Sequence, residues 1–302
     1  MRERMSRIDA GIRYMLFASF MFALMGVFAK LLSQTMPSLE VVFFRNIFGV
    51  IFIAATLVKR PMKHTGGKGW LLFFRGMMGF LALLAFFYNI AHIPLGDAMT
   101  YSKTSPIFTA LFAWILLKER LGTVGWTALF LGFVGILFIA RPTGLILDKT
   151  AWLGIFSGAG AALAYTAVRE LRNYYDTRAI VLSFMVIGTV GPLILMAISP
   201  YVDIPELDML FGEFVIPPAG IWHYIVLMGV FATLAQFYMT KAYGVARAGV
   251  VGAVSYSNIL FSILLGLFIG DPLPDLSTWI GIALIVVAGV AVAAAREGRS
   301  GS

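Results

Sequence analysis

Long apolar stretches follow one another along nearly the whole chain, separated by short breaks. A transmembrane helix needs about 20 mostly apolar residues to cross the hydrocarbon core of a bilayer, so each stretch predicts one spanning helix. The pattern predicts ten spans, at residues 12–32, 39–58, 70–91, 96–117, 123–140, 151–170, 178–199, 221–242, 248–269 and 277–295. Proline, glycine or charged residues occupy most of the breaks, as at 36–38, 59–61, 93–96, 141–144 and 271–274.

The composition agrees with this pattern. Hydrophobic residues make up 60% of the 302 residues and charged residues 13%, against about 25% charged in a typical soluble domain. The chain has no cysteine, which excludes disulfides, thiolate metal sites and cysteine nucleophiles. Its three histidines, His64, His92 and His223, are far apart, so we expect no metal and no cofactor. We also expect no cleaved signal peptide, because the first apolar segment is long enough to remain as a span.

The basic residues predict the orientation. If the N-terminus is cytoplasmic, 17 of the 23 Lys and Arg fall in cytoplasmic segments, and the opposite loops carry only Arg141 and Lys149. The longest opposite loop, residues 200–220, has four acidic residues and no basic one. This asymmetry follows the positive-inside rule and predicts a multi-pass protein of the inner (cytoplasmic) membrane with both termini in the cytoplasm. Topology thus accounts for the net charge of +8, and we expect no nucleic-acid partner.

The two halves of the chain resemble each other weakly. A shift of 139 residues places Lys30 on Arg169 and Gly49 on Gly188, and a slightly longer shift relates spans 4–5 to spans 9–10. Each half, 1–145 and 146–302, holds five predicted spans. An odd number means that the second half enters the membrane upside down, as in the inverted repeats of many secondary transporters. We therefore predict an all-α integral membrane protein with two inverted five-helix repeats around a central cavity.

Short motifs along the first half of the chain resemble those of one known group. They are Phe44-Arg45 with Gly49, Arg75-Gly76, Ser105-Pro106, and the run Lys118-Glu119-Arg120-Leu121 followed by Gly135. In this order the chain resembles the EamA-like branch of the drug/metabolite transporter superfamily. Two departures are Ala128, where a glycine is common, and Gly270-Asp271-Pro272 in place of a Glu-Arg pair. The resemblance implies ten spans, alternating access, and small organic substrates, often amino acids that leave the cell.

The fourth span carries the strongest candidate chemistry. Lys103 lies about a third of the way into it, where a cation costs at least about 2.5–3.5 kcal/mol on insertion scales unless it meets water or a partner. Pro106 removes a backbone donor and predicts a bend, which we interpret as a gating element. Tyr101 and Ser102 add polar groups nearby. Lys103 therefore lines a cavity or, alternatively, extends along the span to the headgroups.

Two arginines also lie within spans. Arg45, at a depth similar to that of Lys103, either contacts substrate or ties span 2 to the carbonyl freed by Pro106. Arg75, one turn inside span 3, is expected to extend to the cytoplasmic interface instead. The other predicted substrate-binding residues are polar or aromatic positions on spans expected to meet at the centre: Tyr88, Asn89, Tyr165, Gln236, Tyr238, Tyr256 and Asn258. A tyrosine here is also compatible with an interfacial or packing role.

These features predict a secondary transporter, not an enzyme. No acidic residue is deep in a span, which disfavours proton coupling, and no phosphate-binding loop is present to use ATP. We expect the substrates to be amino acids or related carboxylates, moved outward. An exchanger or importer of anionic metabolites such as nucleotide-like compounds, or a membrane-embedded enzyme, remains an alternative. Gly154-x-x-x-Gly158 permits close helix contact within the chain or in a homodimer.

Overall fold

The computed structural model describes residues 2–59, 66–117, 122–140, 147–171, 173–202, 204, 207–245, 251 and 254–300. Within these residues every regular element is a helix, which confirms the prediction of an all-helical protein. The breaks predicted at 59–61 and 141–144 and the run 118–121 fall partly or wholly outside the described residues.

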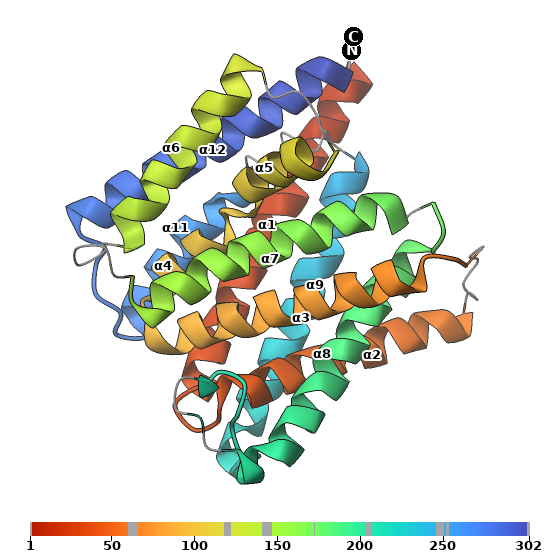
Figure 1. Cartoon of the computed structure of the whole chain (residues 1–302), viewed down its shortest axis with the longest axis vertical. Helices are drawn as coiled ribbons and strands as arrows, with labels where there is room; N and C mark the ends of the chain where they lie inside the picture. The colour runs from red at the N-terminus through yellow and green to blue at the C-terminus, as the bar shows by residue number, and fades with distance from the viewer. Residues whose placement is uncertain are drawn as a thin grey trace.

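The helices follow the predicted apolar stretches closely (Figure 1). They are α1 (Arg2–Leu32), α2 (Ser38–Lys59), α3 (Gly69–His92), α4 (Leu95–Ser102), α5 (Ser105–Leu117), α6 (Thr123–Ala140), α7 (Lys149–Leu171), α8 (Thr177–Ile198), α9 (Trp222–Val245), α11 (Ser257–Phe268) and α12 (Leu276–Ser300), with the short 3-10 turns η1 (Ser199–Tyr201) and η3 (Ala219–Ile221). Seven of the helices contain a segment long and apolar enough to cross a membrane.

Two predicted spans are not continuous helices in the structure. Span 4 is divided into α4 and α5, with a turn at Lys103 and Thr104 between them. In span 9, Tyr256 forms a turn immediately before α11. Neither α4, α5 nor α11 alone reaches the length of about 20 residues that a spanning helix needs. Interrupted helices at membrane depth require protein or water around the freed backbone groups.

Four long helix pairs organise the bundle. Helix α1 packs along α9, α3 along α7, α2 against α8, and α6 along α12 (Figure 1). The N-terminal end of α1 and the C-terminal end of α12 lie at the same end of the molecule. One buried cluster joins α1, α2, α3, α4 and α9 through residues such as Leu32, Phe87 and Ile225. A second joins α5, α6, α11 and α12 around Ile107 and Ile285.

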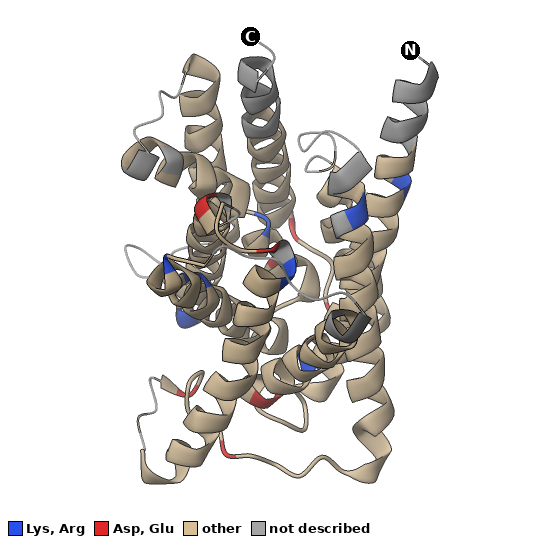
Figure 2. Ribbon diagram, turned by 90° about the vertical axis from the view of Figure 1, so that its right-hand side faces the viewer, with Lys and Arg blue, Asp and Glu red and all other residues tan. Residues whose placement is uncertain are grey.

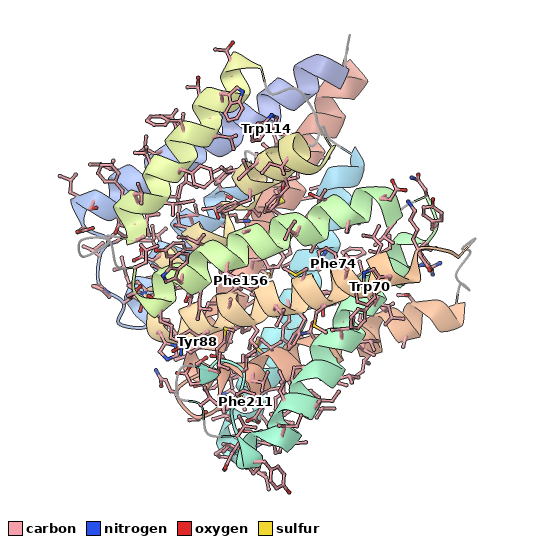
Figure 3. All side chains as sticks on the ribbon, in the orientation of Figure 1. Trp70, Phe74, Tyr88, Trp114, Phe156 and Phe211 are labelled. Carbon is pink, nitrogen blue, oxygen red and sulfur yellow. The ribbon has the colours of Figure 1, made fainter. Side chains whose placement is uncertain are left out.

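The outer surface of the bundle is largely apolar. Trp70 on α3, Trp114 on α5 and Phe156 on α7 are exposed large side chains on this surface (Figure 3). Charged positions are sparse along the helices (Figure 2). Because lipid tails are as apolar as these side chains, the helices are held together by van der Waals contact and buried polar contacts.

Aspartates cap the N-termini of three helices, α7, α8 and α12. Asp148 accepts a hydrogen bond from the backbone of Ala151 at 2.7 Å, and Asp275 accepts one from Thr278 at 2.9 Å. Asp176 accepts one from the backbone of Arg178 at 2.8 Å and a second from its guanidinium, which together hold the pKa of the Asp176 carboxyl below its ordinary value. Such caps satisfy amide groups that have no partner within the helix.

Candidate substrate cavity

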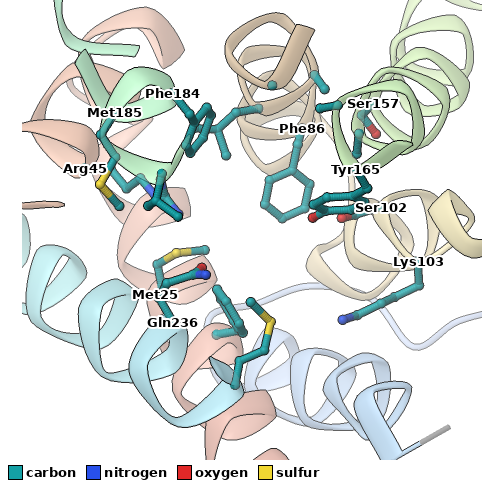
Figure 4. Close-up of a pocket in the computed structure, with 18 of the residues that line it drawn as sticks. Met25, Arg45, Phe86, Ser102, Lys103, Ser157, Tyr165, Phe184, Met185 and Gln236 are labelled. Carbon is teal, nitrogen blue, oxygen red and sulfur yellow. The ribbon is translucent and has the colours of Figure 1, made fainter. Parts of the chain in front are cut away.

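A cavity of about 220 Å³ lies at the centre of the bundle (Figure 4). Helices from both halves contribute to it, and its lining combines aromatic rings, methionines, three cations and a few neutral polar groups. The lining residues are Phe22, Met25, Arg45, Arg75, Gly79, Ala82, Leu83, Phe86, Met99, Ser102, Lys103, Ser157, Ala161, Ala164, Tyr165, Val181, Phe184, Met185, Gln236, Met239 and Asn258. None of these residues is acidic, so the cavity has a strongly positive lining.

Lys103 is positioned by the interruption between α4 and α5. Its backbone amide closes α4 by donating to the carbonyls of Met99 and Thr100, at 3.1 and 3.0 Å. Thr104 then donates its hydroxyl to the carbonyl of Tyr101 at 2.6 Å, which stabilises the turn. The Lys103 side chain extends into the cavity (Figure 4) and has no carboxylate partner among the described residues.

The turn at Lys103 depends on a close approach to α7. A Cβ at Gly158 would lie only 2.0 Å from the Thr104 hydroxyl oxygen, and one at Gly154 would overlap the Tyr101 ring. The Gly154-x-x-x-Gly158 motif therefore makes its contact within the chain. It allows the interrupted α4–α5 segment to pack closely on α7, as small residues do at other membrane helix interfaces.

Arg45 reaches the cavity from α2 and is 8% exposed. Its Nη1 donates to the side-chain oxygen of Asn46 at 3.0 Å. Asn46 in turn donates to the carbonyls of Val42 and Gly188, which fixes the amide between α2 and α8. The alternative in which Arg45 ties α2 to the carbonyl beside Pro106 is not what the structure contains, since the partner of this guanidinium is Asn46.

Arg75 corrects a prediction. We expected its side chain to extend to the nearby end of α3, yet it is 8% exposed and lines the cavity. Its Nη1 lies 3.6 Å from the position that a Cβ at Gly79 would take, so the side chain extends one turn deeper along α3. Its guanidinium carbon lies 4.8 Å from the ring centre of Phe184 on α8, a cation–π contact. The missing side chain at Gly79 makes room for the Phe184 ring, to which a Cβ there would come within 2.9 Å.

Four other predicted site residues line the same cavity: Ser102, Tyr165, Gln236 and Asn258. Tyr165 and Ser102 lie near each other at one side of the cavity (Figure 4). Asn258 donates its amide to the backbone carbonyl of Ser19 at 2.9 Å, which braces α11 against α1. Part of its hydrogen-bonding capacity is therefore used within the protein.

Two predicted site residues lie outside the cavity lining, near the end of the molecule opposite the chain termini. The Tyr88 hydroxyl donates to Asp208 at 3.1 Å, and the ring stacks on His92 at 3.9 Å between centres. Asn89 donates to the carbonyl of Thr150 at 3.0 Å. Both side chains connect α3 to neighbouring segments.

Three further tyrosines predicted to line the site, Tyr101, Tyr238 and Tyr256, are also not part of the cavity lining and make contacts elsewhere. Tyr101 is buried against α7. Tyr238 packs edge-to-face on Phe17 at 4.6 Å between ring centres. The Tyr256 hydroxyl lies 3.4 Å from the backbone carbonyl of Lys103, to which it donates. A Cβ at Gly289 would overlap this hydroxyl, so the glycine admits Tyr256.

Pro106 is the second residue of α5, not the centre of a kink. Proline is tolerated in the first turn of a helix because its missing amide hydrogen has no partner there in any case. The interruption thus precedes the proline, at Lys103 and Thr104. Pro106 follows it and prevents α4 and α5 from joining through a hydrogen bond to the carbonyl of Ser102.

The arrangement is suited to binding, and the residue pattern did not reveal all of it. Arg75 and Phe184 are cavity residues that the sequence analysis did not select. Gly79, one helical turn after Arg75, is a signal that another helix packs closely there, and that helix brings Phe184. Among the described residues no group of His, Asp and Glu is arranged to hold a metal ion.

An apolar helical bundle with a polar cavity at two helix breaks defines the class of membrane transport proteins. Residues 9–141 match the EamA-like transporter family. An uncharacterized transporter of Helicobacter pylori is 33% identical over 94% of this chain and 94% of its own length. The pseudopaline exporter CntI of Pseudomonas aeruginosa is 31% identical over 96% of this chain and 98% of its own. The chain belongs to the EamA-like transporter family, within the drug/metabolite transporter superfamily.

One solved crystal structure has the same fold. It aligns with 95% of this chain and 99% of its own at a TM-score of 0.56 and 20% identity. The family and the named relatives are transporters, so the function of this membrane protein is small-molecule transport.

Proposed function

We propose that the protein is a secondary transporter that exports small organic carboxylates, amino acids among them, across the cytoplasmic membrane. The observation that carries this proposal is the positive cavity, in which Lys103 and Arg45 reach into a space with no acidic lining residue. A buried cation without a protein counter-ion attracts an anionic group, and a carboxylate can accept charge-assisted hydrogen bonds from such a cation. Phe86 and Tyr165 offer aromatic surface for the rest of the substrate.

The proposed architecture is two inverted five-helix repeats, 1–145 and 146–302, with ten spans in total. The helix pairings support it. In such a repeat α1, α2 and α3 correspond to α7, α8 and α9. When each helix is replaced by its counterpart, the α1–α9 pair becomes the α7–α3 pair, which is also present, and the α2–α8 pair stays the same. The α6–α12 pair is likewise its own counterpart. Such a pattern is expected when a two-fold axis relates the halves.

The proposed orientation places both termini in the cytoplasm. The excess of Lys and Arg in the segments on that side supports it. The side chains of Lys30 and Asp271, and those of Lys149 and Asp208, would then meet at the outer end. The proposed export direction draws on the similarity to the pseudopaline exporter.

Transport by the purified protein in liposomes tests the proposal. Vesicles loaded with a radiolabelled amino acid or carboxylate should lose the label faster than protein-free vesicles when the outside is diluted. A cationic metabolite of the same size should stay trapped. Release of the cation, with no release of any carboxylate, would contradict the proposed substrate class. An exchanger of anions remains the second candidate, because the cavity holds more than one cation.

A further inference from the structure

We propose that the cavity has two anion subsites, one formed by Arg45 with Arg75 and the other by Lys103. The preferred substrate is then a short organic anion with acidic groups at both ends, either two carboxylates or a carboxylate and a phosphate. This inference rests on the proposed function and narrows its substrate class.

The arginine pair is the first subsite. Both side chains are only 8% exposed, and their guanidinium carbons lie 5.7 and 4.8 Å from the ring centre of Phe184. The Nε of Arg45 and both Nε and Nη1 of Arg75 have no hydrogen-bond partner among the described residues. Both guanidiniums carry a positive charge and lie near the same ring, so they repel each other. An anion between them relieves the repulsion and accepts the unused hydrogen bonds.

Lys103 is the second subsite. In Figure 4 the Lys103 side chain enters from the side of the cavity opposite Arg45 and Phe184. It comes from the α4–α5 turn, whereas the arginines come from α2 and α3. Because the cations enter the cavity from different helices, we assign one anion to the arginine pair and a second to Lys103.

The charge balance favours two acidic groups over one. Three cations line a cavity that has no acidic side chain among its described lining residues. A monocarboxylate would leave two of them uncompensated, and an uncompensated buried charge is costly. A substrate with two acidic groups compensates at least two of the three charges.

The volume favours a short substrate. At about 220 Å³ the cavity is smaller than the range of about 300–1,000 Å³ that holds drug-sized ligands. A nucleotide is of that larger size, whereas a four- or five-carbon diacid is well below it. The neutral lining between the subsites, with methionines and aromatic rings, suits a short carbon chain.

A matched ligand series tests the inference in liposomes that contain the full-length protein. Succinate, its monoamide succinamate, its diamide and 3-phosphopropionate have similar lengths and differ in charge. We expect succinate to bind at least tenfold more tightly than succinamate, about 1.4 kcal/mol. The phosphate-bearing analogue distinguishes a carboxylate from a phosphate at one end.

The variant Arg75→Gln should weaken the binding of succinate by at least tenfold and the binding of succinamate by no more than about twofold. Arg75→Lys should keep part of the preference for succinate over succinamate. The matched control is Lys68→Gln, which removes a cation just before α3 that pairs with Glu170 at 2.6 Å outside the cavity. It should leave both affinities unchanged.

Equal binding of succinate and succinamate by the unmodified protein overturns the two-subsite inference, even if Arg75→Gln does not fold. In that case transport of either compound still supports the proposed function. If neither these acids nor any other carboxylate moves, the proposed function itself fails.

Discussion

Lys30 and Asp271 form an ion pair between α1 and the segment that joins α11 to α12. The Lys30 ammonium also donates to the carbonyl of Ile93 at 2.9 Å, and Asp271 accepts from the backbone amide of Leu95 at 2.7 Å. One pair of charges thus connects α1, the turn before α4 and the end of α11. In the proposed orientation this network lies at the outer end of the bundle.

Lys30→Met should therefore loosen the outer end, because it leaves the Asp271 carboxylate without its cation. The chain has no cysteine, so Ser102→Cys supplies a single thiol in the cavity lining. An impermeant thiol reagent added outside should label this thiol several-fold faster when Lys30→Met is present. Labelling at an unchanged rate would show that the pair does not control access.

Lys149→Met is the matched control for this experiment. It removes another ion pair at the same end, with Asp208, but those side chains are 37% and 51% exposed, against 18% and 12% for Lys30 and Asp271. Exposed pairs contribute about 0–1 kcal/mol, so the control should change labelling much less.

The topology prediction concerns the two sides of the membrane. Asn173 and Glu213 are exposed residues in connections at opposite ends of α8. With Asn173→Cys and Glu213→Cys made separately, intact cells should label only at position 213 with an impermeant reagent, and permeabilised cells at both. Labelling of both positions in intact cells would contradict the proposed orientation.

The long helices could be predicted because a bilayer demands an uninterrupted apolar length, and that length is visible in the residue pattern. The position of the break in span 4 could not be predicted from Pro106 alone. It depends on the close contact between Thr104 and Gly158, which lie more than fifty residues apart in the sequence. Local sequence indicates that a helix is interrupted, and packing decides where.

The candidate site could be predicted only in part from the sequence. Lys103 and Arg45 were selected because a cation deep in a span is costly wherever it points. The Arg75 guanidinium lies over Phe184, which belongs to another helix and which Gly79 allows to come close to α3. Of the predicted tyrosines, Tyr165 lines the cavity, whereas Tyr88 and Tyr238 pack elsewhere, because the side of a helix that faces a cavity is set by its neighbours.

Pro106 is predicted to act in the conformational change. Pro106→Ala restores a backbone amide that can bond to the carbonyl of Ser102, which would join α4 to α5 and stiffen the turn at Lys103. We expect the maximal transport rate to fall several-fold, with substrate affinity changed less. Pro192→Ala, inside α8 and away from the turn, is the control, and its maximal transport rate should be close to that of the unmodified protein. An unchanged maximal rate would remove Pro106 from the mechanism.

The role of Lys103 is open to the most direct test. Its position at the end of α4 is held by backbone hydrogen bonds that do not involve the side chain. A change of side chain should therefore alter the charge in the cavity while the turn keeps its shape. Lys103→Met suits this purpose, since methionine has a similar length and similar helix propensity.

Lys103→Met should weaken the binding of carboxylate substrates by at least tenfold, about 1.4 kcal/mol, because the variant lacks the charge-assisted hydrogen bond. Lys103→Arg should keep part of the affinity, since it keeps the charge but changes the donor geometry. Equilibrium binding and liposome transport would measure both effects, and a thermal unfolding profile would verify folding. If Lys103→Met binds and transports carboxylates as the unmodified protein does, Lys103 has no part in anion recognition and the first subsite alone must account for it.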